Sequence, residues 1–393
     1  MIIGLVLNKE PGYSETFFVN KINSLMAAGH RVVLFVSSGR KAGSNLAQVR
    51  YAVNLSGSFL RRAVNSTIAL ACLIIKAPLT VWRFLKLEKQ AGISFRISLL
   101  RLIINSHILS VKTDWLHFGF ATLGVDREHV GKAIGAKVAV SLRGYDVSVY
   151  PLKHPGCYEM LWQNVAKVHT ISDDLLKVAY DLGLPRRLPV TKITPAIDAI
   201  RFSNIKAGFF KEGQINILTV ARLHWIKGME YILEALALLQ EDGFNFKYTI
   251  AGDGEDRERL VFAVHQLGLV DRVIFLGKVS HADIPSLMRD NDLYIQYSIQ
   301  EGFCNSVLEA QAAGMLCIVS DAAGLSENVI DDRTGWVVSK RRPDLLAKKI
   351  QEVINMPQDE LLKVTRRATE RIKSEFNLEK QREEFNAFYK ELA

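Results

Sequence analysis

Short apolar segments alternate with helical patterns along the whole chain, and this alternation constrains the fold more than any other feature. Repeated strand–helix–strand order is typical of a parallel sheet with helices on both faces. Helical patterns fill the gaps, as over 229–240 and 257–267. The expected strands are 2–7, 31–36, 115–118, 137–141, 167–170 and 191–193 in the first half, and 216–220, 246–250, 273–276, 293–296 and 316–320 in the second.

The 393 residues are enough for two domains of ordinary size. The stretch from Pro185 to Asp198 contains three prolines and is the expected interdomain linker. We therefore predict an α/β fold of two Rossmann-like domains, 1–196 and 197–376, and a charged C-terminal helix, 377–393, that packs back on the first domain. Ligands of such sheets bind beyond the carboxyl ends of the strands, so the cleft between the domains is the expected site.

Composition indicates a cytosolic protein without a transmembrane helix. The N-terminal residues lack a basic region and a cleavage site, and they are typical of a first strand rather than a signal peptide. The longest strongly apolar run, 68–75, is far shorter than the ~20 residues that span a bilayer. The cysteines form no C-x-x-C pair and are expected to be reduced thiols: Cys72, Cys157, Cys304 and Cys317.

Two basic residues follow the expected strand 216–220. Arg222 and Lys227 lie on a strand-to-helix turn that ends at Gly228. Arginine binds two phosphate oxygens at once and lysine adds a point charge, so together they suit an anionic diphosphate and stabilise negative charge as it departs. Gly228 would allow the following helix to approach the phosphates closely. The alternative is a solvated basic turn with no ligand.

Two glutamates, Glu301 and Glu309, are eight residues apart after another expected strand. If the residues between them are largely helical, the two lie about 12 Å apart, farther than the roughly 5–9.5 Å of a glycosidase pair. The spacing suits binding both ends of a sugar–diphosphate–ribose, with Glu301 on the sugar and Glu309 on the ribose. The backbone N–H groups of Phe303, Cys304 and Asn305 would face the phosphates. The alternative is a helix N-terminal acid followed by an exposed helix acid.

At these residues the chain resembles the family 4 retaining glycosyltransferases, which have the GT-B fold. The resemblance is specific over ARLHWIKGMEYILEAL, YTIAGDGEDRERL, VIFLGKVSHADIPSLM and EGFCNSVLEAQAAGMLCIVSDAAGLSENV. It is looser in the first half, where PGYSETF, LHFG and SLRGYD resemble the exopolysaccharide, colanic-acid-type branch. The resemblance implies transfer from a nucleotide diphosphate sugar, UDP- or GDP-linked, with retained configuration and without metal or cofactor.

The resemblance also implies further donor-site residues. Backbone groups at Lys278 and Val279 would contact the base, and the Gly12 loop would approach the diphosphate. Gly252 follows a strand in a turn that resembles the family's nucleotide-side turn. The alternatives are an ordinary Pro-Gly turn at Gly12 and a plain β-turn at Gly252. We expect Cys304 to be packed, since no Cys-His-acid set accompanies it. The complete expected donor set is Gly12, Arg222, Lys227, Gly252, Lys278, Val279, Glu301, Gly302, Phe303, Cys304, Asn305, Ser306 and Glu309.

On the acceptor side the chain departs from the family, because Arg143 stands where many relatives have histidine. Arginine does not act as a base at neutral pH, but it binds an acceptor phosphate or a donor hydroxyl. His117 is a second candidate within the cleft, with a packed strand-end histidine as the alternative. The candidate catalytic residues are therefore Glu301, Lys227, Arg222, Arg143 and His117, and no metal is expected.

Positive charge is concentrated in segment 57–112, which carries +8 of the chain's +9. Basic residues interleaved with apolar and aromatic ones suit helices lying on an anionic membrane, where a lipid-linked glycan acceptor would be found. We therefore expect a peripheral protein on the inner face of the plasma membrane. The alternative is that the apolar stripe is domain core, and nucleic-acid binding is the weakest reading, because no nucleic-acid module is present. The cations are Arg61, Arg62, Lys76, Arg83, Lys86, Lys89, Arg96, Arg101 and Lys112, with Glu88 as the single acid.

Two other functions fit the same architecture. A nucleotide-sugar epimerase would convert the donor without an acceptor. A non-catalytic subunit that binds glycan or lipid would keep the fold without turnover, and the Arg143 departure leaves this possibility open.

Overall fold

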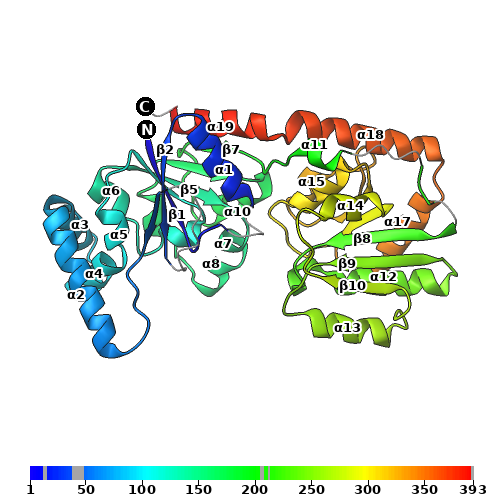
Figure 1. Ribbon diagram of the computed structural model, residues 1–393, viewed down its shortest axis with the longest axis horizontal. Coiled ribbons are helices and arrows are strands. Elements are labelled where there is room, and N and C mark those ends of the chain that lie inside the picture. Colours follow the sequence, from blue (N-terminus) through cyan, green and yellow to red (C-terminus); the bar gives the residue numbers. More distant parts are fainter. Residues whose placement is uncertain (12–15, 38–47, 204–207, 211–212, 391–393) are drawn as a thin grey trace. The chain divides into compact units, whose positions relative to one another are not determined.

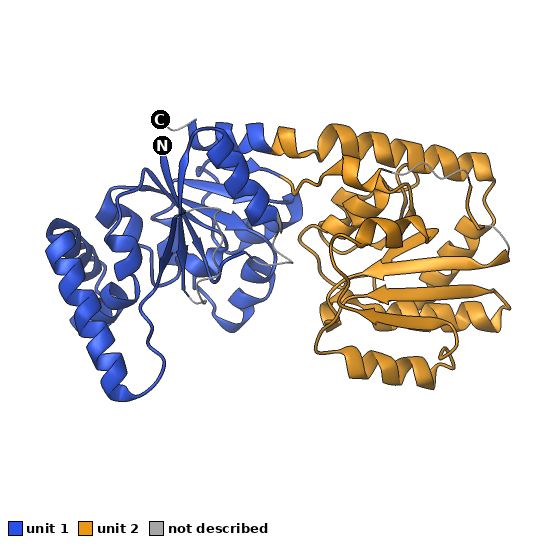
Figure 2. Ribbon diagram, viewed as in Figure 1, with its two compact units in different colours: residues 1–193, 382–393 blue, residues 194–381 orange. Residues whose placement is uncertain are grey.

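The computed structural model describes residues 1–11, 16–37, 48–203, 208–210 and 213–390. The chain forms two compact units, one of residues 1–193 with 382–393 and the other of residues 194–381 (Figure 2). The unit boundary falls at Ile193, within the predicted linker. The expected strand 191–193 is present as β7 (Val190–Lys192), which pairs in parallel with β6 (Lys167–Thr170) and extends the first sheet, so the expected linker overlaps the first unit there.

Unit 1 contains a parallel sheet of seven strands in the order β3-β2-β1-β4-β5-β6-β7 (Figure 1). Its strands are β1 (Ile2–Leu7), β2 (Arg31–Val36), β3 (Gln48–Tyr51), β4 (Trp115–Phe118), β5 (Lys137–Leu142), β6 (Lys167–Thr170) and β7. Its helices are α1 (Thr16–Ala27), α2 (Phe59–Lys76), α3 (Pro78–Gln90), α4 (Phe95–Ile104), α5 (Ser106–Leu109), η1 (Ala121–Gly124), α6 (Val130–Ile134), α7 (Tyr145–Ser148), α8 (Tyr150–Lys153), α9 (Glu159–Trp162) and α10 (Asp173–Asp181).

Unit 2 contains a parallel sheet of six strands in the order β10-β9-β8-β11-β12-β13. Its strands are β8 (Ile215–Val220), β9 (Phe246–Ala251), β10 (Val273–Gly277), β11 (Leu293–Gln296), β12 (Leu316–Ser320) and β13 (Trp336–Val338). Its helices are α11 (Ala199–Phe202), η3 (Trp225–Lys227), α12 (Met229–Glu241), α13 (Arg257–Gln266), α14 (Ile284–Arg289), α15 (Asn305–Ala312), α16 (Leu325–Asn328), α17 (Pro343–Ile354) and α18 (Gln358–Glu375), with α19 (Leu378–Lys390) crossing the boundary between the units.

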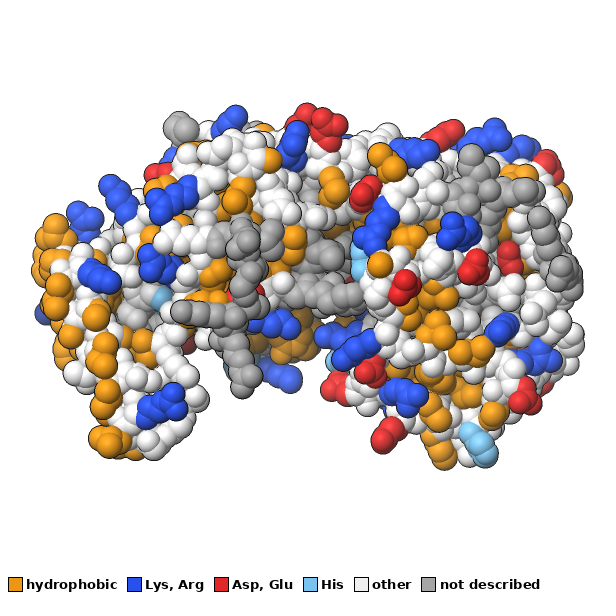
Figure 3. All heavy atoms as spheres, viewed as in Figure 1, with side chains coloured by type: hydrophobic (Ala, Val, Ile, Leu, Met, Phe, Trp, Pro, Cys, Tyr) orange, Lys and Arg blue, Asp and Glu red, His pale blue; other side chains and the backbone are white. Residues whose placement is uncertain are grey.

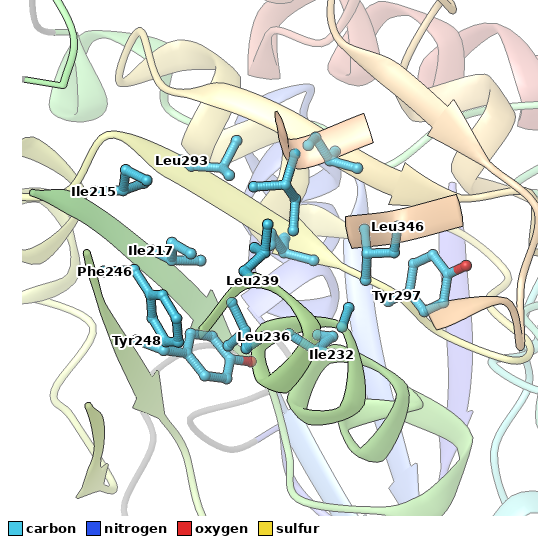
Figure 4. Close-up of a cluster of buried hydrophobic side chains, with 14 of the residues drawn as sticks. Ile215, Ile217, Ile232, Leu236, Leu239, Phe246, Tyr248, Leu293, Tyr297 and Leu346 are labelled. Carbon is cyan, nitrogen blue, oxygen red and sulfur yellow. The ribbon is translucent and has the colours of Figure 1, made fainter. Parts of the chain in front are cut away.

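Each sheet has its own core. In unit 2 the apolar face of α12 packs on β8 and β9, where Ile232 and Leu236 lie near Ile217 and Tyr248 (Figure 4). In unit 1 the end of α19 completes the core, since Phe388 is fully buried beside the first sheet. Burial of such apolar side chains is the main stabilising contribution in both units.

Candidate functional site

The centre of the candidate site lies where the strand order of the second sheet reverses. β8 and β11 are neighbours in the sheet, but helices and two other strands separate them in sequence. The loop after β8 carries Arg222 and Lys227, and the loop after β11 carries Glu301. The Lys227 ammonium forms an ion pair with Glu301 Oε2. The carboxyl ends of two such strands form the usual ligand-binding crevice of an open parallel sheet.

The ion pair is largely, but not completely, removed from solvent. The side chains of Lys227 and Glu301 are 17% and 14% exposed, and the Ser298 hydroxyl donates to Glu301 Oε2 over 3.1 Å. Burial alone lowers the pKa of Lys227, but attraction to Glu301 outweighs burial and raises it. The nearby Arg222 guanidinium opposes that rise. A lysine paired with a carboxylate and an arginine near that lysine therefore lie at the carboxyl end of the sheet, where their positive charge would attract a ligand anion.

Glycines bring the turns of the site together. Gly228 adopts φ +61°, and a Cβ there would lie 2.3 Å from the Tyr297 carbonyl oxygen. Gly252, in the turn after β9, has φ +146°, and its Cβ would lie 1.8 Å from the carbonyl oxygen of Ala221. Any side chain at either position would push the Arg222 turn away from its neighbours. The structural role of Gly252 is therefore to pack against the turn that bears Arg222.

The residues between the two glutamates are only partly helical. α15 begins at Asn305, so the four residues from Glu301 to Cys304 are not helical and the assumption of a largely helical spacing fails for them. The Cys304 N–H donates to Asn328 Oδ1 over 3.0 Å, while Asn328 Nδ2 donates to the Cys304 carbonyl. The prediction that this N–H faces a phosphate is therefore wrong. Gly302 lies against the backbone of Gly324, where a Cβ would be 1.9 Å from the Gly302 carbonyl oxygen.

The other residues at the start of α15 contribute mainly to packing. Phe303 is buried, with its ring 5.7 Å from that of Phe376. The Ser306 hydroxyl accepts a hydrogen bond of 2.7 Å from Tyr294. Burial, reinforced by Glu301, raises the pKa of Cys304, so its thiol stays protonated. Cys304 is thus packed, as the sequence predicts, and it is unsuited to act as a nucleophile.

Glu309 is largely buried and is not an exposed helix acid. Its side chain is 11% exposed, and its Oε1 lies 3.2 Å from His281 Nε2. Lys278 and Val279 follow β10 on the same loop as His281. The Lys278 side chain is 83% exposed and lies 3.9 Å from Asp253, so it is available on the surface next to the glycine turn.

Arg143 follows β5 in unit 1 and is held by aromatic rings. Its guanidinium carbon lies 3.9 Å from the centroid of the Phe17 ring and 4.6 Å from that of Phe18. Its Nε donates to the Gly119 carbonyl over 3.1 Å. These contacts fix a permanent cation at the carboxyl end of the sheet, where the family pattern has histidine. Burial raises the pKa of the neighbouring Asp146, whose carboxylate accepts the backbone N–H of Arg143.

His117 does not belong to an accessible site. It is completely buried in β4, with Nε2 2.8 Å from the Ser141 hydroxyl and Nδ1 2.7 Å from that of Tyr389. Burial is the main cause that lowers its pKa, and the nearby Lys21 adds to the effect. A side chain enclosed in this way does not contact a substrate, so its assignment as a catalytic residue is wrong and the packed histidine is what the structure shows.

Two expectations lie outside this geometry. Gly12 falls outside the described residues, so its proposed contact with the diphosphate has no structural counterpart here. Within the described part of the chain, no group of three or more histidine, cysteine, aspartate or glutamate side chains is arranged to hold a metal ion.

Helices α2 to α4 expose an unusual apolar surface (Figure 3). Of the predicted stripe, Leu73 and Phe84 are buried, but most of the other side chains face solvent. Among the described residues no single helix has both the length and the apolar composition to cross a bilayer; α2 and α3 meet the criterion together, but as a pair bent by 109°. The apolar patch consists of Phe59, Leu60, Val64, Ile68, Ile74, Ile75, Leu79, Trp82, Phe95, Ile97 and Leu100.

The charges around this apolar patch are also exposed. Of the nine cations of segment 57–112, only Arg101 is mostly buried, and it pairs with Glu88, Asp126 and Glu128. Lys86 stacks on Trp82, with 5.0 Å between the ammonium and the ring centroid. The explanation of the apolar stripe as domain core therefore fails for most of its residues. Contiguous exposed apolar surface of this kind marks an interaction site.

Three side chains that organise the site were not singled out from sequence. Ser298 and Asn328 hold Glu301 and Cys304, and His281 holds Glu309. Ser298 lies only three residues before Glu301, so local spacing could have suggested it. Asn328 ends helix α16 and His281 lies on the loop after β10, and only the folded sheet brings both to α15.

Comparison with known proteins gives a consistent result. Residues 201–372 match the family model of the glycosyl transferases group 1. The chain is 28% identical over 400 residues to the colanic acid biosynthesis glycosyltransferase WcaL of Escherichia coli, covering 96% of both chains. It is 23% identical to the amylovoran biosynthesis glycosyltransferase AmsK of Erwinia amylovora, covering 93% of this chain and 94% of that protein.

Solved structures share the fold of this chain. The crystal structure of Anabaena HepE in complex with UDP and glucose has a TM-score of 0.72 at 16% identity and covers 98% of both chains. At this identity the likeness establishes the fold, a pair of Rossmann-like domains of the GT-B type. The predicted α/β fold class and the predicted resemblance to glycosyltransferases of the exopolysaccharide branch are confirmed.

Proposed function

We propose that this chain, a glycosyltransferase of the exopolysaccharide biosynthesis type with a GT-B fold, transfers a sugar from a nucleotide diphosphate sugar to a lipid-linked surface-polysaccharide intermediate. The anomeric configuration is retained and no metal is needed, as in family 4. The observation that carries the proposal is the Lys227–Glu301 ion pair at the strand reversal of unit 2, with Arg222 beside it. WcaL and AmsK, which resemble the chain over almost its full length, are named for polysaccharide synthesis.

The proposed chemistry divides among the charged side chains. Arg222 and Lys227 bind the diphosphate and stabilise the charge that grows as its bond to the sugar breaks. Glu301 accepts hydrogen bonds from the transferred sugar, and Glu309 accepts from the ribose. The acceptor oxygen attacks from the face that the diphosphate leaves, and the departing phosphate takes its proton. The cations replace a metal as the source of positive charge.

Nucleotide binding tests the donor site. We expect calorimetry in the presence of EDTA to show binding of UDP or GDP to the wild-type protein. Arg222→Ala should weaken that binding about tenfold or more, because a charge-assisted contact to phosphate is lost. Arg366→Ala, which removes an exposed arginine from α18, is the matched control. Absence of binding to either nucleotide, or binding that requires a divalent metal, would contradict the proposal.

Acceptor binding is proposed for unit 1. Arg143 does not remove a proton, but its fixed guanidinium suits an acceptor phosphate. We expect Arg143→Ala to raise the KM for a lipid-linked acceptor while the affinity for the donor nucleotide stays unchanged. If Arg143→Ala instead weakens only the binding of the donor nucleotide, Arg143 contacts the donor and its proposed role in acceptor binding is wrong.

The apolar patch of α2–α4 is proposed to contact the cytoplasmic face of the plasma membrane. Exposed aromatic and aliphatic side chains would enter the headgroup region while the surrounding cations attract anionic lipid, each by about 1 kcal/mol. This arrangement would hold the enzyme where a lipid-linked acceptor lies. The cation stacked on Trp82 is suited to the same boundary between water and lipid.

Vesicle sedimentation tests the membrane contact. We expect wild-type protein to sediment with phosphatidylglycerol-containing vesicles and to bind pure phosphatidylcholine vesicles weakly. The double variant Phe59→Ser with Trp82→Ser should lose most of the binding, whereas Phe262→Ser, an exposed aromatic of unit 2, should not. Equal binding by all three proteins would exclude the apolar patch as the membrane contact.

A further inference from the structure

The ribose-binding carboxylate proposed above is held in place by a histidine. His281 lies on the loop between β10 and α14, and its Nε2 is 3.2 Å from Glu309 Oε1. Glu309 is nearly buried on α15, whereas the His281 side chain is about one-third exposed. The contact therefore joins the β10–α14 loop to helix α15.

Arg201 determines which nitrogen of His281 carries the proton. Its Nη1 lies 2.9 Å from His281 Nδ1, and its Nη2 donates to the His281 carbonyl over 2.6 Å. Arginine has donors only, so Nδ1 must be the acceptor and the ring hydrogen must be on Nε2. That Nε2–H then points at Glu309. The ring is packed edge-on against Phe202, with 5.9 Å between the centroids.

We infer that His281 is a positioning residue for donor recognition: it presents the Glu309 carboxylate to the ribose hydroxyls, and Arg201 fixes the His281 tautomer that allows this. The inference rests on the proposed function of Glu309. A carboxylate offers about four lone-pair positions, and the hydrogen bond from His281 uses one. The remaining positions serve the two ribose hydroxyls, and the carboxylate no longer has to be ordered when the nucleotide binds.

The decisive experiment compares the binding of a nucleotide whose ribose has both hydroxyls with that of a nucleotide whose ribose lacks them. Calorimetry measures the Kd of the nucleoside diphosphate that wild type binds, UDP or GDP, and of its 2′,3′-dideoxy form. We expect wild type to prefer the ribose form and Glu309→Ala to lose most of that preference. His281→Ala should weaken the ribose form about three- to tenfold, as expected for one side chain that must be reordered, and leave the dideoxy form unchanged.

Conservative variants separate positioning from simple packing. In His281→Gln the amide oxygen accepts from Arg201 and the amide nitrogen donates to Glu309, so the ribose preference should largely return. Arg201→Ala should reduce the preference less than His281→Ala, and Arg366→Ala should not change it. Circular dichroism of each variant confirms folding, and Glu309→Gln replaces Glu309→Ala if the alanine variant does not fold.

The outcomes distinguish the two levels of the proposal. If wild type shows no ribose preference, or Glu309→Ala keeps it, the ribose role of Glu309 fails and the inference fails with it. If Glu309→Ala loses the preference but His281→Ala keeps the wild-type ratio, the inference alone is overturned. The inference is also overturned if His281→Ala weakens both nucleotides equally, since that would indicate a general structural effect.

Discussion

The two sheets share a strand order around their reversal point, yet each places a lysine near it with opposite consequences. In unit 2, Lys227 pairs with Glu301, and the carboxylate raises the pKa of the lysine despite burial. In unit 1, Lys21 is buried, and its Nζ lies 3.3 Å from both ring nitrogens of His117. Burial and the positive Arg143 lower the pKa of Lys21.

The difference shows how the surroundings of a lysine determine its charge and its availability to a ligand. A lysine with a carboxylate partner at a partly open strand end stays charged and can exchange that partner for a ligand anion. A lysine enclosed against histidine and the aromatic rings of α19 tends toward the neutral form and contributes to packing. Of these two lysines, only Lys227 is therefore placed to serve the proposed diphosphate site.

The strongest test of this contrast is catalytic. Lys227→Ala and Glu301→Ala should each lower kcat about 100- to 1,000-fold, because each removes a charge oriented toward the developing diphosphate or the sugar. Lys21→Met should leave the turnover close to that of wild type. The measurement is nucleoside diphosphate release in the presence of a lipid-linked glycan. If Lys21→Met lowers kcat as much as the other two variants do, the proposed difference between the two lysines is wrong. If Lys227→Ala and Glu301→Ala both turn over at nearly the wild-type rate, the roles assigned to Lys227 and Glu301 are wrong.

A smaller effect tests the backbone that positions Arg222. Gly252→Ala places a Cβ against the Ala221 carbonyl at φ +146°, so the turn must move or strain of about 1–3 kcal/mol must be stored. We expect about tenfold weaker nucleotide binding, measured by calorimetry. Gly243→Ala is the control, since Gly243 also has a positive φ of +82° but no atom within 4 Å of the added Cβ. If Gly252→Ala and Gly243→Ala bind the nucleotide with the same affinity, close packing at Gly252 does not position the Arg222 turn.

The sequence predicted most of the second unit because its signals are local. Strand-to-helix turns with Arg222, Lys227 and Glu301 are read from neighbouring residues, and the fold then brings the turns together. β3 and β13 were missed because they are short, and because every residue of β3 is at least partly exposed and gives no apolar run.

Long-range packing accounts for what the sequence could not supply. Nothing near His117 in sequence reveals that Tyr389, at the far end of the chain, covers it. The rings that hold Arg143 come from α1, more than a hundred residues away in sequence. Likewise, Asn328 removes the Cys304 N–H from the set of phosphate ligands. These features depend on tertiary contacts, which periodicity and motifs do not encode.

The smallest expected effect concerns pH and the buried Lys21. Because its pKa in the folded protein lies below the ordinary value of 10.5, the unfolded chain binds a proton that the folded chain lacks between those two values. The free energy of unfolding of wild type should therefore rise with pH in that window, by at most about 1.36 kcal/mol per unit from this group. The free energy of unfolding of Lys21→Met lacks this rise with pH. If the variant is more stable than wild type at pH 7, the difference should therefore be smaller at pH 9.

Urea unfolding of wild type and Lys21→Met at pH 7, 8 and 9 measures this change, because contributions from the other groups cancel in the difference. Lys153→Met, which removes an exposed lysine from α8, controls for the loss of a surface cation. A difference between wild type and Lys21→Met that stays constant with pH would mean that Lys21 is charged in the folded protein. The two lysines would then differ in their partners but not in their charge, and the availability of Lys227 would depend on its position at the strand ends alone.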